Sequence, residues 1–130
     1  MNAEQMYQEI ILDHYRHPKN FGKIENATIK ERDVNPACGD VIEMTLCIKE
    51  NKVEDIKFTG KGCAISQASA SMLTEDVKRK SLKQVKNIQK EDILKMLGIE
   101  LSGMRLKCAL LALKVLKLGV YKYEGEKNDF

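Results

Sequence analysis

The spacing of hydrophobic residues predicts a helix near the start of the chain. Residues 3–16 carry hydrophobic side chains at intervals of three and four, which places them on one helical face. This face consists of Met6, Tyr7, Ile10, Ile11 and Tyr15. We expect Pro18 to end the helix because proline interrupts helical hydrogen bonding, and residues 19–22 to form a turn.

Three extended segments are expected next, and the second has the clearest pattern. Residues 41–49 alternate between hydrophobic and polar side chains, which is the period of a strand with one covered face. The covered face consists of Ile42, Met44, Leu46 and Ile48. Residues 50–52 turn the chain into a strand over 53–59, and the first strand is expected around 27–34. The pattern predicts antiparallel strands with one polar face.

The rest of the chain changes to helical spacing. Helices are expected over residues 64–80, from the N-cap Ser81 to about 85, over 91–97 before the C-cap Gly98, and from 103 or 104 to about 118. The sequence therefore predicts a single α+β domain over residues 1–130. It has a small three-stranded antiparallel sheet with helices packed on one face, including the N-terminal helix and a long C-terminal helix.

Composition narrows the class of protein. The chain has 130 residues, of which 43% are hydrophobic and 32% charged, as in ordinary globular proteins. The net charge of +3 is too mild to indicate nucleic-acid binding. We see no secretory signal and no hydrophobic run of the roughly 20 residues that a membrane span needs. Reduced cysteines in the cytoplasm fit this pattern better than a disulfide framework does.

Three of the four cysteines are predicted to meet at one end of the sheet. Cys38 and Asp40 are two residues apart in an extended segment, so their side chains point the same way. The hairpin returns the chain to this point at Cys63, and the last helix can bring Cys108 there. The sequence predicts a Cys₃Asp site for zinc or for one edge of an iron–sulfur cluster.

The surroundings of these residues indicate how the site is tuned. Helix N-termini near Cys63 and Cys108 favour thiolates, and Arg105 and Lys107 add positive charge beside Cys108. The carboxylate of Asp40 is a weaker ligand for iron than a fourth thiolate. This indicates a metal ion or cluster that is assembled at the site and then released. We assign no role to the fourth cysteine, Cys47, and a structural or surface role to His14 and His17.

Four segments resemble the U-type iron–sulfur cluster assembly scaffolds, the family of SufU, IscU and the NifU N-terminal domain. The similarity extends from about residue 7 to about residue 116. Three segments carry the expected ligands, and the fourth lies in the first helix. They are Asn35-Pro36-x-Cys38-Gly39-Asp40, Gly60-x-Gly62-Cys63-Ala64-Ile65-Ser66, Arg105-x-Lys107-Cys108 and Asp13-His14-Tyr15-x-x-Pro18.

The resemblance does not select one branch of the family. Lys107 stands where IscU has His, and residues 101–105 lack the prolines of the IscU chaperone-recognition segment, so the ligand segments are closer to SufU. The interval of 45 residues between Cys63 and Cys108 is short, as in IscU. The branch, the resting metal and the use of an Hsp70-type chaperone therefore stay open.

The resemblance implies a function in sulfur traffic. A pyridoxal-phosphate-dependent cysteine desulfurase would donate persulfide sulfur to the chain, and apo iron–sulfur proteins or a carrier would receive the product. An IscU-like chain is a non-enzymatic scaffold that builds a transient [2Fe–2S] cluster, with Cys108 accepting sulfur. A SufU-like chain is a zinc-dependent sulfurtransferase that holds Zn²⁺ and accepts sulfur at Cys38. Both would use the same ligands, Cys38, Asp40, Cys63 and Cys108.

Two other functions fit parts of the pattern. A zinc hydrolase or deaminase also has three protein ligands, but neither H-x-E nor H-E-x-x-H occurs in the sequence. A metal-stabilised interaction module without sulfur traffic would favour a closed ligand set that lacks Asp40.

Overall fold

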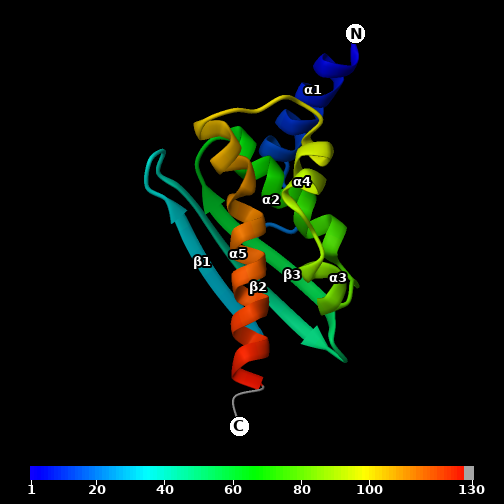
Figure 1. Cartoon of the computed structure of the whole chain (residues 1–130), viewed down its shortest axis with the longest axis vertical. Helices are drawn as coiled ribbons and strands as arrows, with labels where there is room; N and C mark the ends of the chain where they lie inside the picture. Colours follow the sequence, from blue (N-terminus) through cyan, green and yellow to red (C-terminus); the bar gives the residue numbers. More distant parts are fainter. Residues whose placement is uncertain (128–130) are drawn as a thin grey trace.

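The computed structural model describes residues 1–127 and confirms an α+β fold. Figure 1 shows the N-terminal helix, the sheet and the long C-terminal helix. The elements are α1 (Ala3–Arg16), β1 (Ile29–Asn35), β2 (Asp40–Lys49), β3 (Lys52–Lys61), α2 (Ala64–Val77), α3 (Leu82–Lys86), α4 (Lys90–Leu97) and α5 (Met104–Lys127).

The sheet is antiparallel with the strand order β1-β2-β3. Asn35 at the end of β1 pairs with Asp40 at the start of β2, and Val41 pairs with Lys61 at the end of β3. The turn before Asp40 and the segment after Lys61 therefore lie at the same end of the sheet. This arrangement gathers the turn with Cys38 and the segment with Cys63, as the sequence predicts.

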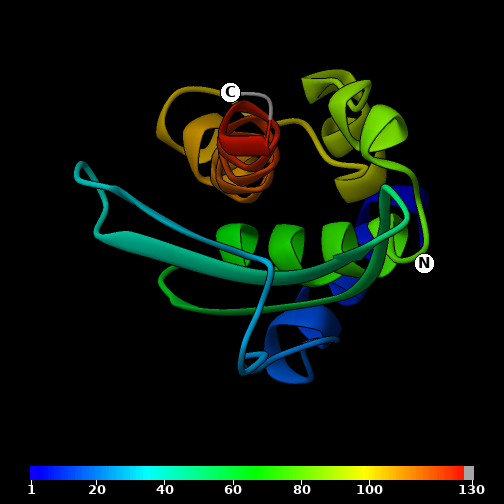
Figure 2. The same cartoon turned by 90° about the horizontal axis from the view of Figure 1, so that it is seen from below.

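The hydrophobic core lies between the sheet and the helices. The alternating side chains of β2 at positions 42, 44 and 46 are fully buried, together with Ile56 and Phe58 of β3. Figure 2 shows α3, α4 and α5 on one side of the sheet. Gly119 lets α5 approach β1 closely, because a side chain there would overlap Ile29. The strands thus present one covered face, as predicted.

Helix α2 is almost completely enclosed and positions the start of α5. It contacts α1, α5 and β3, and its small residues from 66 to 71 are buried. Ser69 Oγ donates a hydrogen bond of 2.7 Å to the carbonyl oxygen of Ala109 in α5. Small side chains allow helices to pack closely, so this contact fixes the residue next to Cys108 against the core.

The segment between α1 and β1 covers part of the opposite face of the sheet, which the sequence did not predict. Phe58 N–H donates to the carbonyl of Asn20 (2.9 Å), and Gly22 N–H donates to the carbonyl of Phe58 (2.8 Å). Further along, Ile24 N–H donates to Thr45 Oγ1 (3.0 Å). Figure 2 shows this segment passing on the side of the sheet away from α5. The free edge of β3 is therefore partly paired.

Several boundaries differ from the predicted ones for local reasons. α2 ends at Val77, because Arg79 adopts a positive φ of 70° that leaves the helix. α5 continues past residue 118 to Lys127, since Gly119 serves close packing and does not end the helix. In α1, only Ile11 of the predicted hydrophobic face is buried, while Met6 and Tyr15 are exposed.

The predicted caps of the short helices are confirmed. Ser81 accepts from the backbone of Gln84, whose side chain in turn accepts from the backbone of Ser81, which forms a capping box. Gly98 ends α4 with a φ of 71°. It lies against the ring of Tyr7, and a side chain at this position would overlap that ring. The contact with Tyr7 fixes the end of α4 against α1.

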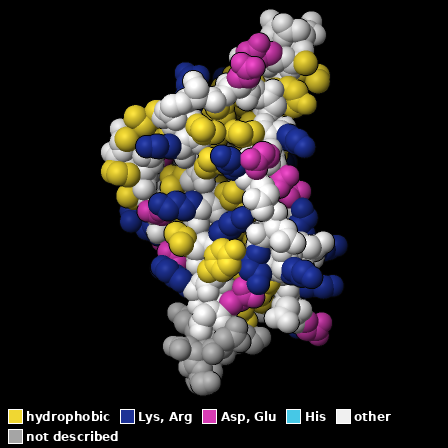
Figure 3. Space-filling view, viewed as in Figure 1, with side chains coloured by type: hydrophobic (Ala, Val, Ile, Leu, Met, Phe, Trp, Pro, Cys, Tyr) yellow, Lys and Arg dark blue, Asp and Glu magenta, His cyan; other side chains and the backbone are white. Residues whose placement is uncertain are grey.

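The surface seen in Figure 3 has mixed charge. Lysine and arginine side chains are spread over the face that carries α5, with acidic side chains between them. Ion pairs link α5 to β1, including Lys114 with Asp33 (2.7 Å) and Lys122 with Glu31 (3.0 Å). Among the helices of residues 1–127, none has the length and hydrophobicity to cross a membrane.

His14 makes a structural contact, which is one of the two alternatives that the sequence leaves open for it. Its Nδ1 lies 2.7 Å from Ser71 Oγ, and the same hydroxyl accepts a hydrogen bond from the N–H of Lys19 (2.8 Å). Burial lowers the pKa of His14 from its ordinary value of 6.5, and Lys19 adds to this effect. The nearby carboxylates of Asp13 and Glu75 oppose it without reversing it.

This lowered pKa predicts that acid destabilises the metal-free protein. The unfolded chain binds a proton at His14 more readily than the folded chain does. His14 therefore leaves the free energy of unfolding undiminished at pH values above 6.5 and lowers it as the pH drops below that value. Urea unfolding from about pH 8 to about pH 5 should show this decrease, and His14→Gln should reduce it. The exposed His17, replaced in the same way, is the matched control. An unchanged pH profile in His14→Gln contradicts the interpretation.

Candidate metal and sulfur site

A tight turn between β1 and β2 presents Cys38. The carbonyl oxygen of Asn35 accepts hydrogen bonds from the N–H groups of Cys38 (3.3 Å) and Gly39 (2.8 Å). Gly39 has a φ of 74°, a conformation that favours glycine and allows the chain to enter β2 immediately. The turn leaves Cys38 exposed at the end of the sheet.

Asp40 connects this turn to the beginning of α2. Its side chain is buried, with 1% of its surface exposed. Oδ1 accepts a hydrogen bond of 2.9 Å from the N–H of Cys63, and Oδ2 lies 3.6 Å from Cys63 Sγ. Gly62 lies against the carboxylate, where a side chain would overlap it. The glycine directly before Cys63 therefore makes room for Asp40.

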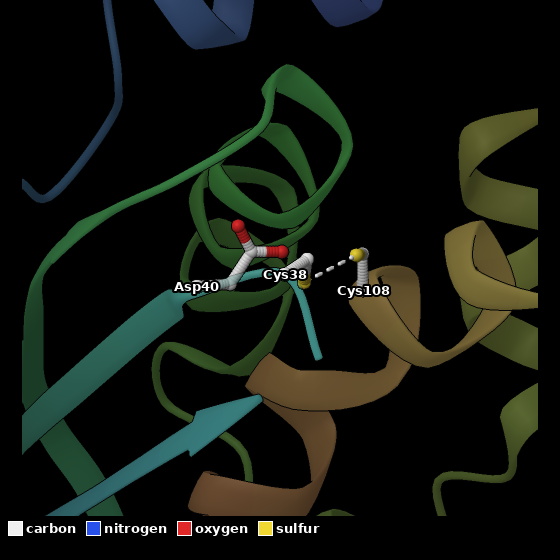
Figure 4. A group of neighbouring side chains, drawn as sticks. All are labelled: Cys38, Asp40 and Cys108. Atoms are coloured by element: carbon white, nitrogen blue, oxygen red, sulfur yellow. Dashed lines mark hydrogen bonds between the residues drawn. The ribbon is translucent and has the colours of Figure 1, made fainter. Parts of the chain in front are cut away.

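Cys108 completes a group of three potential ligands. It lies in α5 with 3% of its surface exposed, and its Sγ is 3.2 Å from Cys38 Sγ. Figure 4 shows Cys38 in the turn before β2 and Asp40 at the start of that strand, with Cys108 facing them from α5. The ligand atoms of Cys38, Asp40 and Cys108 all lie within 4.8 Å of one another.

Cys63 is beside this group but is not part of the three-atom cluster. It is the N-cap residue of α2 and contacts the cluster through Asp40. Its sulfur is exposed, like that of Cys38, whereas Asp40 and Cys108 are buried. The structure thus brings three of the four predicted side chains together, and the fourth, Cys63, contacts this group through Asp40. The sulfurs of Cys38 and Cys63 face solvent, with Asp40 and Cys108 behind them.

The hydrogen bonds around Asp40 favour its ionised form. Burial raises the pKa of Asp40, but hydrogen bonds from Cys108, from the N–H of Cys63 and from the Cys38 and Cys63 thiols outweigh burial. The pKa of Asp40 is therefore lowered. A buried carboxylate with this environment is ready to accept hydrogen bonds or bind a cation.

Cys108 differs from the sequence-based expectation of a thiolate. Burial, followed by hydrogen bonds with Asp40 and Cys38 and by the proximity of Cys63, raises the pKa of the Cys108 thiol. The residue lies in the second turn of α5, where the helix dipole has weakened. In the metal-free protein, therefore, desolvation and neighbouring acceptors outweigh the nearby positive charges.

Arg105 and Lys107 are exposed on α5. Neither makes a hydrogen bond or an ion pair with another of the described residues. Lys107 instead lines a hollow of about 410 Å³ beside the Cys38 turn, together with Pro36, Ala37 and Leu110. A modulating role of the two cations stays a prediction.

Cys47 lies apart from the cluster. It is half-buried near the far end of β2, where it pairs with Asp55 of β3. Its side chain belongs to the polar face of the strand, as the alternation predicted. Cys47 is therefore a suitable internal control for thiol chemistry at the cluster.

The chemistry of the donor set fits a soft or borderline cation. Zinc and iron bind thiolate sulfur and also carboxylate oxygen, and a tetrahedral site needs four donors. Cys38, Asp40 and Cys108 already converge, and Cys63 contacts Asp40 directly. The four residues can therefore hold a metal ion or part of a cluster, and the two exposed sulfurs can receive groups from solvent.

Asn35 and Gly62 are functional neighbours whose roles the sequence did not show. Both occur in the segments that resemble the scaffold family, but their contacts cannot be inferred from those segments alone. Asn35 is buried and its side-chain amide reaches Cys108 Sγ at 3.9 Å. Gly62 borders Asp40. These contacts join segments far apart in the chain, so only the fold reveals them.

Comparisons with known proteins place this site in context. Residues 6–129 match the NifU-like N terminal domain family. The chain is 36% identical over 141 aligned positions to a Bacillus subtilis (strain 168) protein named zinc-dependent sulfurtransferase SufU, with 95% of each chain covered. It is 34% identical over 129 positions to an Escherichia coli (strain K12) protein named iron–sulfur cluster assembly scaffold protein IscU, with 94% of this chain and 97% of the relative covered.

A solved structure shows the same fold and similar sequence. It belongs to a Fervidobacterium islandicum AW-1 protein described as a candidate iron–sulfur cluster assembly scaffold for the SUF system. The TM-score is 0.74 at 31% identity, over 92% of this chain and 99% of the other. The chain thus shares its arrangement of elements and about a third of its residues with this protein.

Replacing Gly62 by alanine should disturb the site through Asp40. The added carbon would overlap the carboxylate, and the φ of 142° is unfavourable for alanine. We expect Gly62→Ala to weaken zinc binding, measured by competition with a chelator, and to lower the urea midpoint.

Gly39→Ala is the matched control because Gly39 also has a positive φ but has open space around it. It should cost only the backbone strain, about 1–2 kcal/mol. Equal zinc affinities of the two variants would show that Gly62 does not act through Asp40.

Proposed function

Because this chain belongs to the NifU-like N-terminal domain family, we propose that it accepts persulfide sulfur and assembles a labile iron–sulfur cluster for transfer to other proteins. The observation that carries the proposal is the convergence of Cys38, Asp40 and Cys108 within 4.8 Å, with Cys63 in contact with Asp40. The names of its relatives support the same function.

Exposure favours Cys38 as the first sulfur acceptor. Its thiolate attacks the outer sulfur of a persulfide on the donor enzyme, which forms a sulfur–sulfur bond on Cys38 and releases the donor's thiolate. Cys108 is buried and cannot meet a large donor directly. Its Sγ lies 3.2 Å from Cys38 Sγ, so it is within reach of a sulfur atom accepted by Cys38.

The ligands proposed for the cluster are also those proposed for zinc. The same four residues would bind either the cluster or a zinc ion: Cys38, Asp40, Cys63 and Cys108. Bound zinc would keep the thiolates deprotonated. Asp40 contributes a charged oxygen that is already fixed by the Cys63 N–H. The carboxylate makes the set weaker toward iron than four thiolates, which suits a cluster that is passed on.

The second candidate function is a zinc-dependent sulfurtransferase that relays sulfur without holding the cluster. Similarity to the Bacillus subtilis SufU protein favours it. The alignment of 141 positions exceeds the length of this chain, so that relative contains residues absent here. Metal analysis after anaerobic purification distinguishes the two, because one zinc per colourless chain favours the sulfurtransferase and visible charge-transfer absorbance favours the scaffold.

We propose that the chain acts as one domain with two kinds of partner in the cytoplasm. The donor is a pyridoxal-phosphate-dependent cysteine desulfurase, and the recipients are apo iron–sulfur proteins or a carrier. The exposed end of the sheet, with Cys38 and Cys63, is where both would approach. The modulating role of Arg105 and Lys107 belongs to this proposal, because both precede Cys108 on the exposed surface of α5.

The sulfur-acceptor role predicts that a cysteine desulfurase and free cysteine modify Cys38. Peptide mass analysis after alkylation should find an added sulfur on Cys38, and Cys38→Ser should abolish most transfer. Cys47→Ser is the matched control because Cys47 lies away from the site.

Sulfide output under reducing conditions should rise with the wild-type chain and not with Cys38→Ser. If the wild-type chain leaves sulfide output unchanged and gains no sulfur under metal-defined conditions, the proposed function is wrong. Modification at Cys108 in the Cys38→Ser variant would overturn the order of acceptors and leave the function in place.

The carboxylate predicts how firmly a cluster is held. Asp40→Ala removes the oxygen donor, and we expect the variant to retain a reconstituted cluster longer than wild type during transfer to an apo-protein. Visible absorbance over time measures the loss. Asp40→Asn keeps an oxygen that can accept from the Cys63 N–H, so it separates ligand chemistry from loop structure. Equal or faster loss from Asp40→Ala removes the argument for a labile load.

A further inference from the structure

Asn35 is a buried polar residue between the two sulfur-bearing elements. It is the last residue of β1, where 8% of its surface is exposed, and it pairs with Asp40 across the hairpin. Its carbonyl oxygen closes the Cys38 turn by accepting from two N–H groups. Its backbone role does not depend on its side chain.

The two ends of the Asn35 side chain contact different segments. Oδ1 accepts a hydrogen bond from the N–H of Ala37 in the turn (3.2 Å), and Nδ2 donates to Cys108 Sγ in α5 (3.9 Å). The amide therefore bridges the Cys38 turn and Cys108, which are 70 residues apart in the chain. A side chain with both a donor and an acceptor is needed for this bridge.

The donated hydrogen bond is distinctive because the other neighbours of Cys108 are acidic or sulfur groups. Cys38 Sγ lies 3.2 Å from Cys108 Sγ, and the carboxylate of Asp40 belongs to the same cluster of ligand atoms. Each carries negative charge when it serves as a ligand. The Asn35 amide presents an N–H to the same sulfur, and hydrogen bonds to ligand sulfur tune metal sites.

We propose that Asn35 is a positioning residue that holds Cys108 Sγ beside the Cys38 turn, in the position from which it can act as a ligand. The inference rests on the proposed function, since it concerns the load that these cysteines would hold. The bridge keeps the buried sulfur at its 3.2 Å separation from Cys38. The alternative is that the Asn35 side chain serves only the local turn through its bond to Ala37.

Three substitutions separate these two roles. Asn35→Asp and Asn35→Ser each keep an oxygen that can accept from Ala37 N–H, and neither offers an amide N–H to Cys108. Asn35→Ala loses both contacts. A local turn role predicts that Asp and Ser rescue the defect of Ala, whereas the positioning role predicts that they do not.

The test uses Co²⁺ and Zn²⁺ with the whole chain. Thiolate-to-cobalt charge-transfer absorbance reports the sulfur ligands, and competition with a chelator reports the zinc affinity. We expect all three variants to show weaker charge-transfer absorbance and about 10-fold to 100-fold lower zinc affinity than wild type. Urea unfolding of the metal-free proteins should show that Asn35→Ser remains folded and closer to wild type than Asn35→Ala.

The outcomes separate this inference from the proposed function. Wild-type absorbance and affinity in both Asn35→Asp and Asn35→Ser overturn the positioning role and leave a turn role. A wild-type chain that takes up neither metal overturns the inference together with the metal site. Normal metal uptake with no persulfidation of Cys38 by a desulfurase overturns the proposed function and leaves the role of Asn35 intact.

Discussion

The buried carboxylate of Asp40 is the contact on which the site depends. It accepts the backbone N–H of Cys63 at the start of α2, and it lies within reach of the sulfurs of Cys38 and Cys108. An ionised group with 1% exposure is costly without such partners. Its hydrogen bonds therefore hold β2, α2 and α5 in one arrangement at the end of the sheet. Gly62 makes this possible because it leaves space beside the carboxylate.

Packing in the core positions α5 and therefore Cys108. Small buried residues along α2 let α5 lie close to it, and Ser69 ties the backbone of α5 at Ala109, next to Cys108. Further along α5, Gly119 allows close contact with β1. The position of the buried sulfur is thus set by packing along the whole helix, while the position of Cys38 is set by a turn of a few residues.

Local patterns were enough to predict the elements, and contacts between distant segments were not. Alternation in β2 and the caps at Ser81 and Gly98 depend on neighbouring residues, so they were found from the sequence. The extension of α5 beyond Gly119 does not follow from local patterns, because the packing partner of this glycine is in β1. The meeting of the ligand segments followed from hairpin geometry, but the raised pKa of Cys108 depends on burial that no motif encodes.

The raised pKa of Cys108 links metal loading to proton release. A cysteine binds a metal as the thiolate, so a buried thiol must lose its proton when a cation arrives. Asp40 is ionised beforehand, and its charge disfavours a second negative charge on Cys108 until a cation compensates both. Cys38 is exposed and is therefore not subject to this burial. The arrangement therefore places one sulfur at the surface and another behind it, and under the proposed function the first would meet the sulfur donor and the second would serve as a ligand.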